Sequence, residues 1–360
     1  MPSEVRNAVI TGWGKCLPPA VLSNADLETL TDTTDEWITT RTGIKERRIS
    51  HVETSDMSAV AGLRAIAAAG LEPDDIDIVF LATCSPDRLI PSAATITQHK
   101  LGMGSVPAMD LNAACTGFVY GLTLADQMIR AGGIDRALVI GAEKLSYWLD
   151  FTDRTTCVLF GDGAGAVVVE ASEEDAGILG HEIRSDGSAA GLLCAPFSGT
   201  EGTPDAAGLS AIRMEGPEVF RRAVKSMGDA STNVVVGAGL ALEDVDLLIP
   251  HQANVRIIDA TARRLDLEPS KVFVNIASYG NTSAATIPIA LTEALEEGRV
   301  KPGDAIVFAA FGGGFTWGAA LVRWGERTEP LGVSDASLPP NDATALELVA
   351  GNVAVHGKGI

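Results

Sequence analysis

Two stretches of this chain follow the same pattern. Gly70–Val79 resembles Gly239–Leu248 at an offset of 169 residues, from 70 to 239, and Ala137–Ile140 resembles Ala305–Phe308 at an offset of 168. Between these anchors each copy reads as helix, turn, buried strand, loop, long helix, turn and buried strand. A repeat this long exceeds the period of solenoid proteins, and it predicts an α/β domain that has been duplicated.

The duplication also aligns two polar side chains. Cys115 in the first copy falls on Asn281 in the second, at an offset of 166 from 115 to 281. Each stands where a loop gives way to a helix of small and apolar residues. A thiol and an amide at equivalent helix starts predict one site, built by both copies on a pseudo-twofold axis.

The repeat divides the chain into four parts. Residues 1–175 and 213–325 are the two halves, and residues 176–212, rich in Gly, Ser, Asp and Pro, are expected to be a connector with irregular structure. Residues 326–360 have no counterpart in the first half and carry several prolines and acids. We expect this acidic appendage to be ordered only by lying on the body, with one short helix over 343–350.

Apolar runs and helix stops locate the elements within each half. The expected helices are Met57–Ala69, Thr116–Ala131, Pro217–Ala238 and Ser283–Glu297. The expected strands are Asn7–Trp13, Ile78–Ala82, Val106–Leu111, Ala137–Gly141, Leu247–Pro250, Val272–Ile276 and Ala305–Ala310.

Composition excludes several classes of function. With 27 basic and 47 acidic residues the net charge is −20, which opposes unaided binding to nucleic acid or to an anionic membrane. The chain has no apolar run long enough for a membrane span and no signal-peptide profile at its start, so we expect a cytoplasmic protein. The five cysteines are widely spaced and form no C-x-x-C pair, which argues against a disulfide framework and against a zinc site.

Arginines gather on two expected helices despite the negative charge. Arg221 and Arg222 lie on one, and Arg256, Arg263 and Arg264 lie on the other. They are either two ordinary solvated helix faces or a local docking surface for an acidic partner.

Cys115 is the strongest candidate for chemistry. It follows a strand and a turn of small residues, and it begins a helix. The helix N-terminus supplies partial positive charge and free N–H groups, which favour a thiolate and a nearby oxyanion. The alternative is a buried structural cysteine, which the other four cysteines fit.

His251 and Asn281 are candidates of a second kind. His251 follows the strand Leu247–Pro250, and a strand end in an α/β domain is where side chains project into a crevice. Asn281 follows Gly280 at a helix start. The alternatives are a satisfied core or capping histidine and a turn or N-cap asparagine.

Two glycine runs have different meanings. Gly161–Ala166 resembles a dinucleotide fingerprint, but a valine run that reads as strand follows it, so it fails the test for a pyrophosphate site. Phe311–Phe315 joins two strands through three successive glycines. Such a run allows close approach to a ligand and exposed N–H groups.

Six motifs together resemble those of the β-ketoacyl-acyl carrier protein synthase III family, in the thiolase superfamily, which initiates fatty acid synthesis. They occur in family order over about residues 5–325. The resemblance implies the thiolase fold, in which two duplicated βαβαβ-type halves form a five-layered αβαβα arrangement. The motifs are Thr34–Ile44, Asn112–Phe118, Gly161–Ala166, Pro250–Asn254, Gly280–Ala285 and Phe311–Gly318.

The resemblance implies a role for each catalytic candidate. Cys115 is similar to the acyl-accepting nucleophile of the family, and His251 and Asn281 are similar to its two partners. Gly313 resembles the residue whose N–H shares the oxyanion hole with the N–H of Cys115.

The resemblance also implies binding residues. Trp37, Arg41 and Arg154 resemble residues that hold the adenine and phosphates of coenzyme A, and Asn254 resembles one near the pantetheine arm. Arg221 and Arg256 resemble basic positions implicated in carrier-protein docking. This favours the docking interpretation of both basic helices, with Arg222, Arg263 and Arg264 included.

Two departures leave the acyl primer open. The chain continues after Trp324, unlike the most familiar members of the family. Leu89 and Ile90 stand before Pro91, where the family's acyl pocket is shaped by the residue that precedes the proline, so Ile90 is the expected pocket residue.

The resemblance implies a decarboxylative Claisen condensation of an acyl-CoA primer with malonyl-acyl carrier protein. The acyl group rests on Cys115, and His251 and Asn281 each donate an N–H to the enolate oxygen. Acyl-CoA and acyl carrier protein are the expected partners, and the enzyme is expected to be a homodimer without a metal or a cofactor beyond its thioester substrate.

Other functions compete with this one. A specialised relative could prime polyketide or other secondary metabolite synthesis, or transfer an acyl group without decarboxylation. A Cys-His-Asn amidase would use the same residue types, but the duplication does not fit it. A catalytically silent scaffold is opposed by the presence of all three residues.

Overall fold

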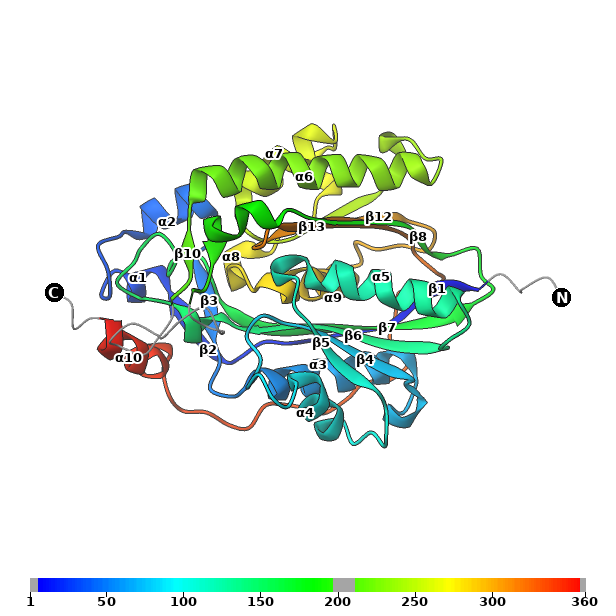
Figure 1. Cartoon of the computed structure of the whole chain (residues 1–360), viewed down its shortest axis with the longest axis horizontal. Coiled ribbons are helices and arrows are strands. Elements are labelled where there is room, and N and C mark those ends of the chain that lie inside the picture. The colour runs from blue at the N-terminus through cyan, green and yellow to red at the C-terminus, as the bar shows by residue number, and fades with distance from the viewer. Residues whose placement is uncertain (1–5, 197–210, 357–360) are drawn as a thin grey trace.

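The structure is a computed structural model that describes residues 6–196 and 211–356. Two β-sheets lie face to face with a helical layer between them, and further helices cover both outer faces (Figure 1). This is the five-layered αβαβα arrangement that the resemblance implies. The chain ends and the middle of the expected connector lie outside the described residues.

The first sheet has five strands in the order β1-β7-β6-β4-β5. β4 lies between β5 and β6 and is parallel to both, whereas β7 runs antiparallel to β1 and β6. All five residues of β4 are buried, as expected for a strand covered on both faces. The strands are β1 (Asn7–Cys16), β4 (Ile78–Ala82), β5 (Ala108–Leu111), β6 (Arg136–Lys144) and β7 (Asp162–Ser172).

The second sheet repeats this order as β11-β12-β13-β8. β11 is parallel to β12, and β13 is antiparallel to both β12 and β8, so that β8 occupies the place that β1 has in the first sheet. The expectation of irregular structure in the connector is therefore wrong for Gly177–Ser185. The strands are β8 (Gly177–Ser185), β11 (Leu247–Pro250), β12 (Ala305–Gly312) and β13 (Thr316–Arg323).

Six helices form the three helical layers. α5 and α9 lie between the sheets, α3 and α4 cover the outer face of the first sheet, and α6 and α7 cover that of the second (Figure 1). They are α3 (Thr54–Ala69), α4 (Ala93–Lys100), α5 (Gly117–Arg130), α6 (Gly216–Gly237), α7 (Val255–Arg264) and α9 (Thr286–Glu296).

The second half packs closely on the first sheet because two glycines leave room for it. A Cβ on Gly165 would lie 2.7 Å from the backbone nitrogen of Ile289, and one on Gly141 would lie 2.2 Å from the carbonyl oxygen of Ala284. Real side chains are excluded at such distances, so α9 and the turn before it depend on these glycines.

The structural repeat corrects the expected alignment of the two site residues. The 3₁₀ turn η2 (Ala114–Thr116) precedes α5, and the 3₁₀ turn η7 (Ser283–Ala285) precedes α9, at an offset of 169. Each turn begins with a left-handed residue, Ala114 at φ 46° and Ser283 at φ 51°. Cys115 therefore corresponds to Ala284, and Asn281 lies three residues earlier, because the sequence alignment slipped within the loop.

One expected strand is absent from the described structure. In Val272–Ile276 only Val272 forms a bridge, to Leu248. The backbone N–H of Asn275 donates instead to the side chain of Gln252, at 3.1 Å, and a helix begins at Ile276. This side-chain bond ends the pairing with β11.

Smaller elements complete the fold. A helix does form in the appendage, at Ala345–His356 rather than 343–350. No helix within the described ranges is long and apolar enough to cross a membrane. The remaining helices and strands are α1 (Asn24–Leu27), α2 (Asp35–Thr42), α8 (Ile276–Tyr279), α10 (Ala345–His356), β2 (Ala20–Ser23), β3 (Glu46–Ile49), β9 (Leu193–Cys194) and β10 (Arg213–Met214). The remaining 3₁₀ turns are η1 (Pro73–Asp75), η3 (Leu145–Trp148), η4 (Gly187–Leu192), η5 (Leu242–Asp244) and η6 (Pro269–Lys271).

Candidate active site

Cys115 lies where two cavities meet. One cavity of about 500 Å³ is lined by Cys115, His251 and Asn281, so the structure brings the three candidates to one space. We refer to it as the entry cavity. A second cavity of about 890 Å³ is also lined by Cys115, together with Gly313, and we refer to it as the inner cavity. A nucleophile at this junction can reach groups held on either side.

The backbone nitrogen of Cys115 lies close to the end of β12. A Cβ on Gly312 would lie 2.7 Å from the backbone nitrogen of Cys115, so only glycine lets the two segments approach. Gly313 follows on the wall of the inner cavity. This places the Gly313 loop beside the Cys115 backbone, as an oxyanion site shared by their N–H groups requires.

The thiol of Cys115 is protonated in the unliganded site. The side chain is 8% exposed, and burial raises the pKa of the Cys115 thiol to about 12, outweighing the opposing hydrogen bond with Ser283. Desolvation therefore opposes the thiolate that the helix start is expected to favour, because burial penalises the charged form.

His251 is a buried, neutral imidazole. Burial lowers the pKa of His251 from 6.5 to about 3. Its Nδ1 lies 2.7 Å from the hydroxyl oxygen of Thr286, whose own hydroxyl also lies 2.9 Å from the carbonyl of Ser283. Thr286 thus fixes the ring through Nδ1 and leaves Nε2 for the cavity.

Asn281 is oriented by its own turn. Its Oδ1 accepts a hydrogen bond from the backbone N–H of Ser283 at 2.8 Å, which assigns Nδ2 to the opposite side of the amide. Within residues 6–196 and 211–356, Nδ2 has no hydrogen-bond partner. The turn role considered for Asn281 is present, and it leaves a free donor.

A tryptophan between two arginines lines the entry cavity. The guanidinium carbon of Arg41 lies 4.9 Å from the ring centroid of Trp37, and that of Arg154 lies 5.3 Å from it. All three residues line the cavity, which gives it an apolar surface edged by positive charge.

Asn254 also lines the entry cavity, with a structural task. It caps α7, since its Oδ1 accepts from the backbone N–H of Arg256 at 2.9 Å, and its Nδ2 donates to the carbonyl of Arg41 at 3.0 Å. Asn254 therefore ties α7 to α2.

The arginines of the neighbouring helices α6 and α7 differ in whether an acidic side chain pairs with them. Arg221 and Arg222 pair with Glu218, and Arg264 pairs with Asp229. Within the described ranges Arg256 and Arg263 make no ion pair. Arg256 also lies over the ring of Phe220 and lines the entry cavity.

The structure does not bring Ile90 into the inner cavity of its own chain. Leu89 lines that cavity, whereas Ile90 is 88% exposed beside it. Two exposed apolar residues at the rim of a site are unusual unless something covers them.

Comparison with known proteins agrees with this geometry. Residues 109–187 match the family model for 3-oxoacyl-[acyl-carrier-protein (ACP)] synthase III, and residues 236–324 match that for its C-terminal part. The chain is 54% identical over 345 residues to a Vibrio cholerae protein named beta-ketoacyl-[acyl-carrier-protein] synthase III 2, covering 95% of each. The chain belongs to the β-ketoacyl-acyl carrier protein synthase III family. Its members are acyl-transferring condensing enzymes.

Solved structures show the same fold for this synthase. The crystal structure of a 3-oxoacyl-[acyl-carrier-protein] synthase III from Aquifex aeolicus has a TM-score of 0.84 and 51% identity, covering 88% of this chain and all of that one. A priming β-ketosynthase from the R1128 polyketide pathway has a TM-score of 0.83 and 35% identity, covering 90% of this chain and 98% of that one. The thiolase fold that the resemblance implies is confirmed.

Sequence reasoning missed a buried carboxylate behind the synthase site. Glu143, at the end of β6, is fully buried and accepts hydrogen bonds from Ser85 Oγ at 2.5 Å, from Ser283 Oγ at 2.9 Å and from the Cys84 backbone N–H at 3.1 Å. Burial raises the pKa of Glu143. An acid two residues beyond the apolar run Ala137–Gly141 was the signal that could have drawn attention to it.

The described residues contain no group of three or more His, Cys, Asp or Glu side chains that could hold a metal ion.

Proposed function

We propose that this synthase joins an acyl-CoA primer to malonyl-acyl carrier protein with loss of carbon dioxide, and so initiates type II fatty acid synthesis. The observation that carries the proposal is the position of Cys115 between two cavities, with His251 and Asn281 lining the entry cavity. One cavity suits the arriving thioester and the other suits the acyl group left on Cys115.

Loading begins with coenzyme A in the entry cavity. The Trp37 ring offers a stacking surface for adenine, and Arg41 and Arg154 offer charge for the phosphates. The Cys115 sulfur attacks the thioester carbonyl, the bond to the coenzyme A sulfur breaks, and that sulfur leaves with the thiol proton. Burial raises the pKa of the Cys115 thiol to about 12, so ionisation of the thiol before the attack is costly.

Condensation uses the neutral donors. When malonyl-acyl carrier protein replaces coenzyme A, the carbon–carbon bond to the carboxylate breaks and its electrons reach the thioester oxygen. The Nε2–H of His251 and the Nδ2–H of Asn281 stabilise that enolate oxygen, a role in which one donor is worth about 10²–10³ in rate. His251 donates from Nε2 in the tautomer whose Nδ1 accepts the Thr286 hydroxyl, and in that tautomer the hydroxyl proton turns from the Ser283 carbonyl, 2.9 Å away, to the imidazole.

The enolate carbon then attacks the acyl group on Cys115. The resulting oxyanion accepts hydrogen bonds from the N–H groups of Cys115 and Gly313, and its collapse releases the β-ketoacyl product from the sulfur. The thiolate released in this step takes up a proton from solvent, which restores the starting thiol. Every step uses residues of this chain, and we propose that no cofactor is needed beyond the thioester substrates.

We propose that the carrier protein docks on the arginines of α6 and α7. Arg263 and Arg221 are exposed on the two helices, while Arg256 stands where this surface meets the entry cavity. A pantetheine arm arriving at that point has a direct path to Cys115. We also propose a cytoplasmic homodimer, in which a second copy covers Leu89 and Ile90.

Mass spectrometry tests the proposal directly. Incubation with acyl-CoA should place the acyl mass on Cys115, and Cys115→Ala should abolish it. Replacement of the partly buried Cys84 by alanine is the matched control and should still load. Acylation of any cysteine other than Cys115 would contradict the assignment.

The decarboxylation half has its own variants. Asn281→Asp keeps an oxygen for the Ser283 N–H but loses the donor, so carbon dioxide release should fall by about 10²–10³. His251→Ala should act similarly, while acyl loading survives at least in part in both. Normal decarboxylation in both variants would refute the donor role.

Priming of polyketide synthesis is the second candidate. The similarity to the R1128 priming β-ketosynthase supports it. An acyl-CoA panel assayed with malonyl-acyl carrier protein separates the two, and carbon dioxide release excludes or supports transfer without decarboxylation. The low pKa of His251 argues against the amidase, because an imidazole of pKa about 3 is a weak general base at neutral pH.

A further inference from the structure

The C-terminal appendage is bound along the body of the protein. After β13 the chain passes over α3, where the backbone N–H of Leu331 donates to the carbonyl of Ala68 at 2.9 Å and Arg64 donates to the carbonyl of Ala336 at 3.0 Å. It then reaches α10, which lies beside β2 and β3 at the far end of the molecule from the N-terminus (Figure 1).

α10 packs on the 3₁₀ turn η3 (Leu145–Trp148). Ala345 and Val349 of α10 are 3% and 2% exposed and belong to the apolar cluster that contains Leu145. The side chain of Asn352 adds hydrogen bonds to this apolar contact. The Nδ2 of Asn352 donates to the carbonyls of Ser146 at 2.8 Å and Tyr147 at 3.1 Å.

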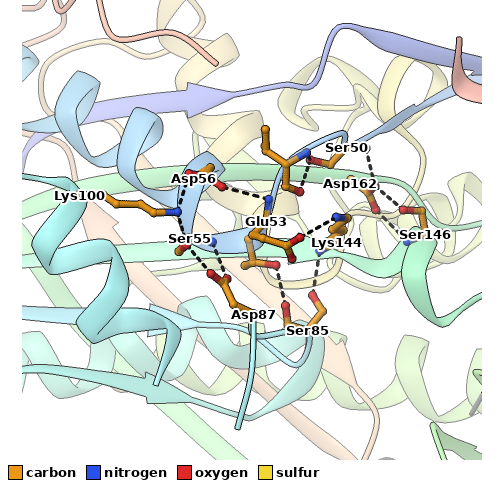
Figure 2. A network of polar contacts seen from close by, with 12 residues as sticks. Ser50, Glu53, Ser55, Asp56, Ser85, Asp87, Lys100, Lys144, Ser146 and Asp162 are labelled. Atoms are coloured by element: carbon orange, nitrogen blue, oxygen red, sulfur yellow. Dashed lines mark hydrogen bonds and ion pairs between the residues drawn. The ribbon is translucent and has the colours of Figure 1, made fainter. Parts of the chain in front are cut away.

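η3 is held from its other side by a buried carboxylate. Asp162 accepts hydrogen bonds from the backbone N–H of Ser146 at 2.9 Å and from its hydroxyl at 2.6 Å (Figure 2). The turn is therefore clamped between the protein core and the appendage.

The clamped turn is a wall of the inner cavity. Leu145, Tyr147 and Trp148 all line it, together with Cys115. The cavity of about 890 Å³ is much larger than a two-carbon acyl group needs. A short primer therefore occupies only the part next to Cys115, whereas a longer one extends along the walls.

We propose that α10, through Asn352, positions the η3 wall of the inner cavity and thereby determines how efficiently longer acyl primers are loaded. This rests on the proposed function, because it takes the inner cavity as the acyl site. A wall held in its binding conformation saves the cost of ordering it when the chain binds. Asn352 is thus a positioning residue for long primers and has no effect on the chemistry at Cys115.

The experiment compares acyl-CoA primers on the full-length enzyme. Rates of Cys115 acylation with acetyl-, butyryl- and octanoyl-CoA are measured for the wild type, for Asn352→Ala and for Asn341→Ala. Asn341 is a matched control, because it is an asparagine of the same appendage whose side chain bonds, among the described residues, only to Ala343.

We expect Asn352→Ala to lower kcat/KM for octanoyl-CoA about five- to tenfold, as befits the loss of one to two hydrogen bonds, mainly through a higher KM. The kcat/KM for acetyl-CoA should change less than about twofold in Asn352→Ala, and Asn341→Ala should match the wild type with every primer. Hydrogen–deuterium exchange should be faster over residues 145–149 in Asn352→Ala, and unchanged in α3.

Three results would overturn the inference. The first is a ratio of kcat/KM for octanoyl-CoA to kcat/KM for acetyl-CoA that is the same in Asn352→Ala as in the wild type. The second is an equal fall of kcat/KM for all primers together with a lower Tm. The third is a wild-type enzyme that loads acetyl-CoA alone. If the wild type loads no acyl-CoA on Cys115 at all, the proposed function itself fails, and the two failures are therefore distinguishable.

Discussion

The neutral state of His251 makes the stability of the fold depend on pH. The folded pKa is about 3, against 6.5 for an unperturbed imidazole, because the ring is 2% exposed. Below pH 6.5 the unfolded chain takes up a proton that the folded protein refuses. Stability from this group is therefore complete above pH 6.5 and is lost as the pH falls toward 3.

The magnitude follows from the pKa difference. A pH of 5 lies about 1.5 units below the pKa of 6.5 that the imidazole has in the unfolded chain. At 1.36 kcal/mol per unit, the free energy of unfolding is therefore about 2 kcal/mol lower at pH 5 than at pH 8. The figure does not depend on the folded value as long as that value lies well below 5.

Urea unfolding at pH 8 and pH 5 measures the effect. Other carboxylates titrate in this range, Asp162 among them, since burial raises its pKa to about 6. His251→Gln is the reference that cancels them, because it removes only the titrating imidazole. The wild type should lose about 2 kcal/mol more than this variant between the two pH values. A difference below about 0.5 kcal/mol would mean that the folded protein accepts the proton, and the neutral donor would be refuted.

Three further changes test the surroundings of the site. Glu143→Gln leaves fewer acceptors for the donors of Ser85, Ser283 and Cys84, so it should lower the free energy of unfolding by about 1–3 kcal/mol, and equal stability in urea would contradict the organising role of Glu143. Thr286→Val removes the hydroxyl that fixes Nδ1 of His251, so decarboxylation of malonyl-acyl carrier protein should fall about tenfold with acyl loading unchanged, and a normal rate would show that packing alone orients the ring. Arg263→Glu should raise KM for malonyl-acyl carrier protein but leave KM for a malonyl-CoA surrogate unchanged, and the effect should become smaller as the salt concentration rises. Arg256→Glu should raise KM for both substrates, because Arg256 also lines the entry cavity. Equal effects of Arg263→Glu on both donors would move the docking surface elsewhere.

The duplication made much of the fold predictable. A second copy of one pattern predicted two similar sheets, and the buried runs located β4 and β11 at their observed bounds. β8 was missed because Gly177–Ser185 is only partly buried and alternates weakly, so no apolar run reveals it. Its place became clear only through the sheet order, where it corresponds to β1.

The residues of the site could be predicted from the sequence, but their protonation states could not. Cys115, His251 and Asn281 could be named from a helix start, a strand end and a turn, with the family resemblance as support. Their protonation depends on burial, which comes from elements far away in the sequence. Such burial opposes the thiolate expected at Cys115, and the helix start alone carries no information on burial.

Burial of both the thiol and the imidazole is coherent with the proposed chemistry. Burial penalises any lasting charge, so it raises the pKa of the Cys115 thiol and lowers the pKa of His251. The low local dielectric of a buried site also strengthens a hydrogen bond to a charge that exists only briefly. The Asn281 amide, held by the Ser283 backbone N–H, and the His251 ring, held by Thr286, are already in position when the enolate oxygen develops its charge. Such a site stabilises a ground-state anion little and stabilises the transition state most. We therefore expect variants that admit water near His251 to lose decarboxylation before they lose acyl loading.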